Sequence, residues 1–380
     1  MIELVATCLF GLEKQLGAEI DALGCRRIDT MDGRVTFAGE MCDIARANVF
    51  LRTAERVYLR VGAFPARSFT ELFDGVRALP FEEYIGAHNA FPVTGHAIKS
   101  ALYSVPDCQS IIKKAVVERL SSVYGIKIFP EDGAPCRVEF FLFKDVATLM
   151  IDTTGSALHK RGYRPTSGAA PLRETLAASL AMEARPREDT LIHDPFCGSG
   201  TILIEAAMIL KNIAPGAGRN FAAMDFDFLP KRVWRDAADE ANAAVRREAR
   251  PTLYGSDTDG EILKLAAENA RRAGVGECIR FFAADARKIQ KVEADARGTV
   301  ICNPPYGERM LDVRQAEELY RAIAAPFHAL SPWQIYILTS HPRFEALYGK
   351  RADKVKKLYN GMIPCYLYEY FRPDFLKKKR

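Results

Sequence analysis

The chain has 380 residues, of which 48% are hydrophobic and 27% are charged, and its formal net charge is +5. This length suffices for two or three folded domains, and no apolar run reaches the roughly 18 residues of a membrane span. Basic and acidic residues balance up to residue 165, so the chain lacks the strongly basic character that would by itself identify a nucleic-acid-binding protein.

The nine cysteines and six histidines favour neither disulfides nor a metal centre. An odd number of cysteines without a Cys-x-x-Cys pair is typical of reduced thiols in the cytoplasm. The histidines show no i, i+4 spacing, and Met1–Leu4 lacks the basic start of an export signal. We therefore predict a cytoplasmic protein that neither binds a metal nor associates with a membrane.

The first 150 residues alternate between strand-like and helix-like patterns, which is typical of an α+β module. Such modules bind RNA or support a neighbouring enzyme. Strands are predicted at Ile2–Ala6, Arg34–Phe37, Val57–Val61, Cys136–Leu142 and Ala147–Asp152, and helices at Gly11–Leu23, Met41–Asn48, Phe69–Arg77 and Ser110–Val123.

A basic junction, Leu158–Arg164, and a linker-like stretch, Pro165–Gly168, follow this module. Basic clusters are usually solvated surfaces, but this one lies between the domains and includes a tyrosine that can stack on a base. The RNA contacts that we predict there are Lys160, Arg161, Tyr163 and Arg164.

Beyond the linker, strands alternate with helices up to Thr339, the pattern of a mostly parallel, doubly wound sheet. Between the strand Thr190–His193 and the apolar helix Ile202–Leu210 lies a glycine loop whose backbone N–H groups can approach a ligand closely. It matches neither a phosphate loop nor a dinucleotide fingerprint. A lone Gly-x-Gly is more often just a tight turn, but the spacing of the motifs downstream favours a loop that binds the carboxylate and ribose end of an adenosyl cofactor. Its predicted contacts are Asp194, Phe196, Cys197, Gly198, Ser199, Gly200 and Thr201.

Two further strands end in aspartates. Leu253–Asp257 places a carboxylate where it can accept the ribose hydroxyls, with Asp259 as a second candidate. Arg280–Asp285 ends in an acid that can accept the adenine amino group, and Ala286 follows it. Each aspartate alone is more often a helix N-cap, but together at the carboxyl ends of strands they favour ligand binding.

The tetrapeptide Asn303-Pro304-Pro305-Tyr306 follows the strand Gly298–Cys302. The amine of a base is a poor nucleophile because its lone pair is delocalised, and two rigid acceptors, Asn303 and the Pro304 carbonyl, can hold its hydrogens. The prolines stiffen the turn, and Tyr306 offers a face for stacking. We predict that these four residues are catalytic in an N-methyltransferase and that Asn303 also contacts the cofactor, although the tetrapeptide alone fits a structural turn equally well.

An insertion separates the first and second strands of this sheet, over residues 211–252. It contains a polar segment, Lys231–Arg250, that is predicted to be helical. Its position between two strands predicts a wall over the cofactor or the target base.

These motifs resemble the THUMP-domain class I S-adenosylmethionine-dependent RNA methyltransferases, most closely the RlmL-type guanine-N2 methyltransferases of 23S ribosomal RNA. The glycine loop and Asn-Pro-Pro-Tyr are shared with adenine and glutamine methylases, whereas Leu158–Arg164, Ala170–Glu174 and Lys357–Ile363 are specific to this family. The resemblance covers nearly the whole chain. It implies a ferredoxin-like segment at 1–56, a THUMP domain at 57–157, a junction at 158–168 and a Rossmann-like methyltransferase domain at 169–380.

The resemblance also implies an activity: transfer of a methyl group from S-adenosylmethionine to N2 of a guanine in RNA, with 23S ribosomal RNA or a large-subunit precursor as partner. An N6-adenine methyltransferase of DNA or RNA and a tRNA guanine-N2 methyltransferase stay open as alternatives, because Asn-Pro-Pro-Tyr does not separate them. A non-enzymatic RNA-binding assembly factor is a third. Some family members carry a second methyltransferase domain, and the length of this chain leads us to expect a single activity.

Overall fold

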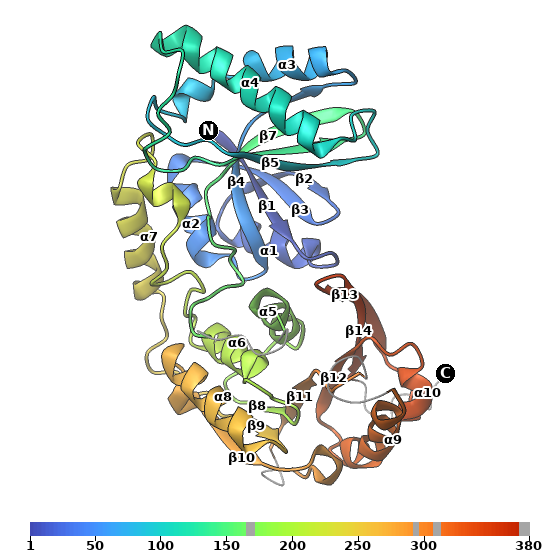
Figure 1. Cartoon of the computed structure of the whole chain (residues 1–380). Helices are drawn as coiled ribbons and strands as arrows, with labels where there is room; N and C mark the ends of the chain where they lie inside the picture. Colours follow the sequence, from blue (N-terminus) through green and yellow to red (C-terminus); the bar gives the residue numbers. More distant parts are fainter. Residues whose placement is uncertain (165–171, 292–295, 307–312, 372–380) are drawn as a thin grey trace. The chain divides into compact units, whose positions relative to one another are not determined.

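The computed structural model describes residues 1–164, 172–291, 296–306 and 313–371, in two compact units that each carry a seven-stranded sheet (Figure 1). One unit comprises residues 1–8, 16–158 and 218–240, and the other comprises residues 9–15 and the described parts of 159–217 and 241–380. The predicted linker at Pro165–Gly168 lies outside the described residues, as do Ala170 and Pro171. None of the helices in the described ranges is both long and apolar enough to cross a bilayer.

The amino-terminal part has the predicted α+β character. Its elements are β1 (Ile2–Cys8), α1 (Glu13–Ala22), β2 (Arg26–Met31), β3 (Arg34–Gly39), α2 (Met41–Phe50), β4 (Ala54–Pro65), α3 (Phe69–Arg77), η1 (Phe81–Glu83), β5 (Val93–Ile98), α4 (Val105–Tyr124), β6 (Val138–Phe143) and β7 (Val146–Asp152). The sheet order is β2-β3-β1-β4-β7-β6-β5, and every neighbouring pair is antiparallel except β5 and β6. Helices α3 and α4 pack against each other and contact β4 and β5, respectively (Figure 1).

Strand β4 joins the two halves of this sheet. It pairs with β1, where Leu59 faces Leu4, and with β7, where Leu59 faces Ile151. The predicted domain boundary between residues 56 and 57 therefore falls inside one continuous strand. A row of fully buried side chains follows this register across five strands and forms part of the core; it consists of Phe37, Leu4, Leu59, Ile151 and Val138.

The sequence patterns do not predict β2 or β5. Strand β2 is exposed along most of its length and polar, so it shows no alternation of apolar and polar residues. Strand β5 contains Gly95, where an added Cβ would lie 2.2 Å from the Phe140 carbonyl oxygen, and none of its side chains is fully buried. A strand without a buried face leaves no period-two signal in the sequence.

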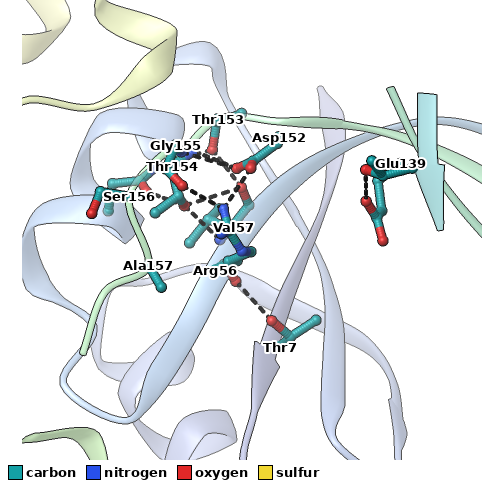
Figure 2. Close-up of polar contacts among 12 residues, drawn as sticks. Thr7, Arg56, Val57, Glu139, Asp152, Thr153, Thr154, Gly155, Ser156 and Ala157 are labelled. Carbon is teal, nitrogen blue, oxygen red and sulfur yellow. Dashed lines mark hydrogen bonds and ion pairs between the residues drawn. The ribbon is translucent and has the colours of Figure 1, made fainter. Parts of the chain in front are cut away.

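A polar network fastens the start of β4 to the chain that leaves β7 (Figure 2). Arg56 donates from Nη1 to Asp152 Oδ2 and to the Gly155 carbonyl oxygen, each at 2.6 Å. The other carboxylate oxygen of Asp152 accepts the backbone N–H groups of Thr154 and Gly155, at 2.9 and 3.1 Å. The Thr154 hydroxyl in turn accepts the Val57 N–H at 2.8 Å. This network satisfies backbone groups at a point where the strand ladder ends.

The second unit carries a Rossmann-like sheet. The elements from residue 172 onward are α5 (Glu174–Glu183), β8 (Leu191–Asp194), α6 (Thr201–Leu210), η2 (Ala222–Asp225), α7 (Arg232–Ala243), β9 (Leu253–Asp257), α8 (Gly260–Arg272), η3 (Gly276–Cys278), β10 (Ile279–Ala283), η4 (Ala286–Lys288), β11 (Gly298–Cys302), α9 (Val313–Ala329), β12 (Gln334–Thr339), α10 (Phe344–Tyr348), β13 (Lys354–Asn360) and β14 (Ile363–Tyr370); of these, η2 and most of α7 belong to the first unit.

The strand order of this sheet is β10-β9-β8-β11-β12-β14-β13, with the first five strands parallel and β14 and β13 antiparallel. The chain fills one side of β8 first and then starts again at β11 on the other side. This switch opens a crevice at the carboxyl ends of the central strands, where sheets of this kind bind ligands. The predicted doubly wound fold is confirmed.

Burial explains why the central strands form as they do. Both β8 and β11 are buried along their whole length, as parallel strands covered on both faces are. Tyr320, Ile323 and Phe327 of α9 belong to the same buried cluster as residues of β11 and β12. These strands are therefore encoded by continuous apolar runs because both of their faces are buried in the protein.

The polar network at β4 generates a stability prediction. Thr154→Val keeps the shape of the side chain but removes the acceptor for the Val57 N–H and the donor to Asn48 Oδ1. Because both partners are buried, we expect a loss of about 1–3 kcal/mol in the free energy of unfolding, measured by urea denaturation. Thr30→Val, the same change on the exposed strand β2, is the control. Equal stability of the two variants would contradict the role of the network.

Candidate active site

A cavity of about 930 Å³ opens at the carboxyl ends of β8, β9, β10 and β11, within the second unit. The predicted catalytic residues and all but one of the predicted cofactor residues line this cavity, although Asp194 and Tyr306 lie more than one hundred residues apart in the sequence. The predicted residues that line it are Asp194, Phe196, Cys197, Gly198, Ser199, Thr201, Asp257, Asp259, Asp285, Ala286, Asn303, Pro304, Pro305 and Tyr306. The exception is Gly200.

The glycine loop turns between β8 and α6 through two residues with positive φ, Gly198 at 49° and Gly200 at 80°. At Gly200, an added Cβ would lie 3.1 Å from the Phe281 ring and 3.2 Å from the Ala266 Cβ. Gly200 therefore shapes the loop and lets it pack closely against β10 and α8, and it does not line the cavity. Gly198 lines the cavity, and its N–H donates to Asp257 Oδ2 at 3.0 Å.

The two aspartates at the end of β9, Asp257 and Asp259, differ in the groups that they already bind. Asp257 accepts the Gly198 N–H with one oxygen and the Asp259 N–H with the other, at 3.0 and 3.1 Å. Asp259 caps α8, because its Oδ1 accepts the N–H groups of Glu261 and Ile262. Both carboxylates nevertheless line the cavity, and Asp257 is the one that the glycine loop holds in place.

Asp194 is almost completely buried at the end of β8, where its Oδ1 accepts the Phe196 N–H at 3.0 Å. Burial, and to a lesser extent the charge of Asp257, raises the pKa of Asp194 to about 8. The cavity lining carries five acidic residues against two arginines, Arg164 and Arg287. A cavity with this balance favours a cation, which fits the sulfonium of the S-adenosylmethionine that the resemblance implies.

Asp285 forms an ion pair with Arg287, which the sequence analysis did not predict. Arg287 donates to it through its side chain, with 2.6 Å between Nη2 and Oδ2, and through its backbone N–H at 2.9 Å. These hydrogen bonds lower the pKa of Asp285. Arg287 also lines the cavity, so a ligand amine that approaches Asp285 meets this ion pair.

Asn303 leaves β11 with its side-chain oxygen buried, and among the described residues this Oδ1 has no hydrogen-bond donor. None of those residues donates to the Pro304 carbonyl either. The next carbonyl along, that of Pro305, accepts from the Tyr320 hydroxyl at 2.9 Å. An unpaired buried acceptor costs about 1–3 kcal/mol, so the site keeps two acceptors ready for a ligand that brings N–H donors.

Two of the four junction residues are not placed for the RNA contact that the sequence predicts. Arg161 and Tyr163 are buried, and both point to Glu205 of α6, at 3.5 Å from Arg161 Nε and 3.0 Å from the Tyr163 hydroxyl. The prediction that Tyr163 offers a ring to RNA is therefore wrong, and so is a surface role for Arg161. Lys160 is exposed. The basic and aromatic residues alternate here because Arg161 and Tyr163 both bind the buried carboxylate of Glu205.

Arg164 has a different position from the one predicted, because it lines the cavity. It is paired with Glu174 at 2.7 Å, and its Nη1 donates to Thr201 Oγ1 at 3.2 Å, at the start of α6. The guanidinium therefore lies beside the helix N-terminus. The sequence indicated a basic residue here but not its place in the lining of the cavity.

The predicted wall over the cofactor is also wrong. None of the residues in 211–252 lines the cavity. Residues 218–240 belong to the first unit, where the N–H groups of Ala222 and Ala223 donate to Thr154 and Thr153. In the same unit Arg46 pairs with Glu240 at 2.9 Å.

Sequence reasoning also missed Asn360, which lies at the end of β13 and lines the cavity. Its Nδ2 donates to the Tyr306 hydroxyl oxygen at 3.2 Å. The available signal was its place in Lys357–Ile363, a segment that carries the family resemblance. In the part of the chain that the structure describes, no three His, Cys, Asp or Glu side chains gather as metal ligands.

Three family models match the chain in succession. The RlmL ferredoxin-like domain matches residues 3–58, the THUMP domain matches residues 66–152, and the RMKL-like methyltransferase domain matches residues 161–369. The last of these covers the entire cavity lining.

Two curated relatives align over nearly the whole chain. YpsC of Bacillus subtilis strain 168, named Putative RNA methyltransferase, is 40% identical over 97% of this chain and 95% of its own length. Ribosomal RNA large subunit methyltransferase K/L of Psychromonas ingrahamii is 33% identical over 95% of this chain. This chain spans 49% of that second relative.

Solved structures agree with these matches. SMU.472, crystallised in complex with SAH, superposes with a TM-score of 0.91 at 38% identity and covers 98% of both chains. A protein of Listeria monocytogenes described as a predicted N6-adenine-specific DNA methylase superposes with a TM-score of 0.92 at 43% identity, over 98% of this chain and 96% of that one. With its ferredoxin-like, THUMP and RMKL-like methyltransferase domains, the chain belongs to the RlmL-type family of THUMP-domain, S-adenosylmethionine-dependent RNA methyltransferases.

Proposed function

We propose that this protein transfers the methyl group of S-adenosylmethionine to the exocyclic N2 of a guanine in RNA, with 23S ribosomal RNA or its precursor as substrate. The observation that carries the proposal is the buried Oδ1 of Asn303, to which none of the described residues donates, in an acid-lined cavity. The RNA substrate is supported by the THUMP domain and by the names of the two curated relatives. The ribosomal target follows the K/L relative, which is about twice as long as this chain.

We assign the cofactor to the part of the cavity that the glycine loop and Asp257 line. Asp257 would take the ribose hydroxyls, and the backbone of Gly198 and the start of α6 would approach the methionine end, near Arg164. The other acidic side chains of the lining provide negative charge for the sulfonium, and Asp194 would add to it when cofactor binding ionises its carboxyl group. The bound cofactor supplies an activated methyl group.

The protein's own contribution is to hold the target amine. Asn303 Oδ1 and the Pro304 carbonyl accept its two N–H groups, which draws the lone pair out of conjugation and directs it toward the methyl donor. The same two oxygens stabilise the positive charge that develops on nitrogen, and one held proton is then released to solvent. Tyr306 stacks on the flipped-out base. The Pro305 carbonyl already accepts a hydrogen bond from the Tyr320 hydroxyl, so we do not assign it to the target amine.

The alternatives differ in the nucleic acid and in the base. An N6-adenine methyltransferase is suggested by the description of the Listeria monocytogenes structure, and a tRNA guanine methyltransferase would use the same four residues. An RNA-binding assembly factor would need neither a cofactor nor the free Asn303 oxygen. Measurement of S-adenosylmethionine binding separates this third alternative from the enzymes.

The product identifies the reaction. Incubation of the purified protein with transcribed 23S ribosomal RNA and labelled S-adenosylmethionine should yield N2-methylguanosine after nuclease digestion. Transfer RNA and double-stranded DNA serve as competing substrates. Label in N6-methyladenosine, or label in transfer RNA alone, would overturn the proposed base or the proposed RNA.

Asn303→Ala should lower kcat at least about 100-fold, because it removes one of the two acceptors that orient and stabilise the amine in the transition state. Cofactor affinity, measured by calorimetry, should change little. Asn242→Ala, the same truncation at an exposed position on α7, is the matched control. A rate for Asn303→Ala within a few-fold of wild type would contradict the assigned role.

Asp194 generates a pH prediction. Its raised pKa of about 8 means that the ligand-free protein holds this carboxyl group protonated at pH 7, and a cationic ligand favours the ionised form. Cofactor binding at pH 7 should therefore release up to about one proton, and affinity relative to Asp194→Asn should rise as the pH increases from 6 to 8. Calorimetry in buffers of different ionisation enthalpy measures the release. The same proton release in Asp194→Asn would exclude this group as its source.

A further inference from the structure

Asn360 occupies a defined position at the rim of β13. It pairs with Ile363 of β14 across the two-residue turn Gly361-Met362. Its side chain is carried into the cavity, where the residue is only 8% exposed. Because the sheet fixes its backbone, the place of this amide in the cavity is set by the pairing of the two strands.

The two ends of the Asn360 amide have different environments. Nδ2 donates to the Tyr306 hydroxyl oxygen at 3.2 Å, which anchors one end. Among the described residues, no donor reaches the other end, Oδ1. The cavity therefore has a further acceptor, held beside the ring on which the target base is proposed to stack.

An acceptor in this position distinguishes the two purines that carry an exocyclic amine. In guanine, the ring atom next to the N2 amine on the Watson–Crick edge is N1–H, a donor. In adenine, the atom next to the N6 amine is N1, an acceptor, which would face Asn360 Oδ1 with two lone pairs and no proton between them. Sites that hydrogen-bond a substrate group reject analogues without it, because their own polar atom is then left unpaired.

We propose that Asn360 is a specificity-determining residue whose Oδ1 accepts N1–H of the guanine while Asn303 and Pro304 hold its N2 amine. This inference rests on the proposed function. The bond to Tyr306 orients the amide so that its oxygen faces the base. In this proposal the residue that selects guanine lies on β13, the antiparallel strand at the edge of the sheet. The residues that hold the reacting amine lie elsewhere, in the Asn-Pro-Pro-Tyr turn after β11.

The test pairs one protein change with one base change. The substrate is a short RNA that spans the nucleotide methylated in the 23S assay, made with guanine or with 2-aminopurine at that nucleotide. 2-Aminopurine keeps the N2 amine but has an unprotonated N1. We expect the wild-type kcat/KM to fall about 10- to 100-fold with 2-aminopurine. The kcat/KM of Asn360→Ala on the guanine substrate should be lower than that of wild type by a similar factor. Replacing guanine by 2-aminopurine should then lower the kcat/KM of this variant little further.

Two further variants complete the experiment. Asn360→Asp keeps an oxygen acceptor, with the Tyr306 hydroxyl able to donate to it, and should retain the preference for guanine. Met362→Ala changes the 94% exposed residue of the adjoining turn and should behave as wild type. Cofactor affinity should stay within about threefold of wild type in all three variants.

The outcomes separate this inference from the function on which it rests. If wild type methylates no guanine in RNA, the proposed function fails. If wild type methylates guanine but Asn360→Ala keeps the full preference over 2-aminopurine, only the role of Asn360 is overturned. A loss of cofactor affinity in Asn360→Ala would also overturn it, because Asn360 would then belong to the cofactor site.

Discussion

The proposed chemistry depends on a buried oxygen, Asn303 Oδ1, to which none of the described residues donates a hydrogen bond. Asn303 ends a strand that is buried along its whole length, and the prolines after it cannot supply the N–H groups that would otherwise pair with nearby acceptors. The Tyr320 hydroxyl, which also bonds to Thr339, donates to the Pro305 carbonyl, so this carbonyl differs from the Asn303 and Pro304 oxygens in having a donor among the described residues. The burial of β11 and of the neighbouring strand β8 along their whole length offsets this cost.

Much of this site could be predicted from local patterns. Strands that alternate with helices place their carboxyl ends along one edge, so Asp194, Asp257, Asp285 and Asn303 were expected to converge although no pairing between strands was known. The glycine loop was recognisable for the same reason, since it lies between a strand and a helix. Local sequence alone specifies these features because each depends on only one βα unit.

Features that depend on distant partners could not be predicted. Arg161 and Tyr163 have the composition of an RNA-binding patch, and only the position of Glu205 shows that they are buried. Asn360 reaches the cavity through two antiparallel strands whose pairing no local motif encodes. Residues 218–240 lie between two strands of one sheet in sequence but fold with the other unit. In each case the deciding contact is far away along the chain.

The path of residues 218–240 has a mechanical consequence. The polypeptide passes from one unit to the other before and after this segment, as well as near residues 9, 16 and 159. A protease that cut only within the junction at 159–164 would produce two fragments, and each fragment would contribute residues to both units. Each unit is thus assembled from more than one stretch of the chain, and five covalent crossings connect the two units in place of a single linker.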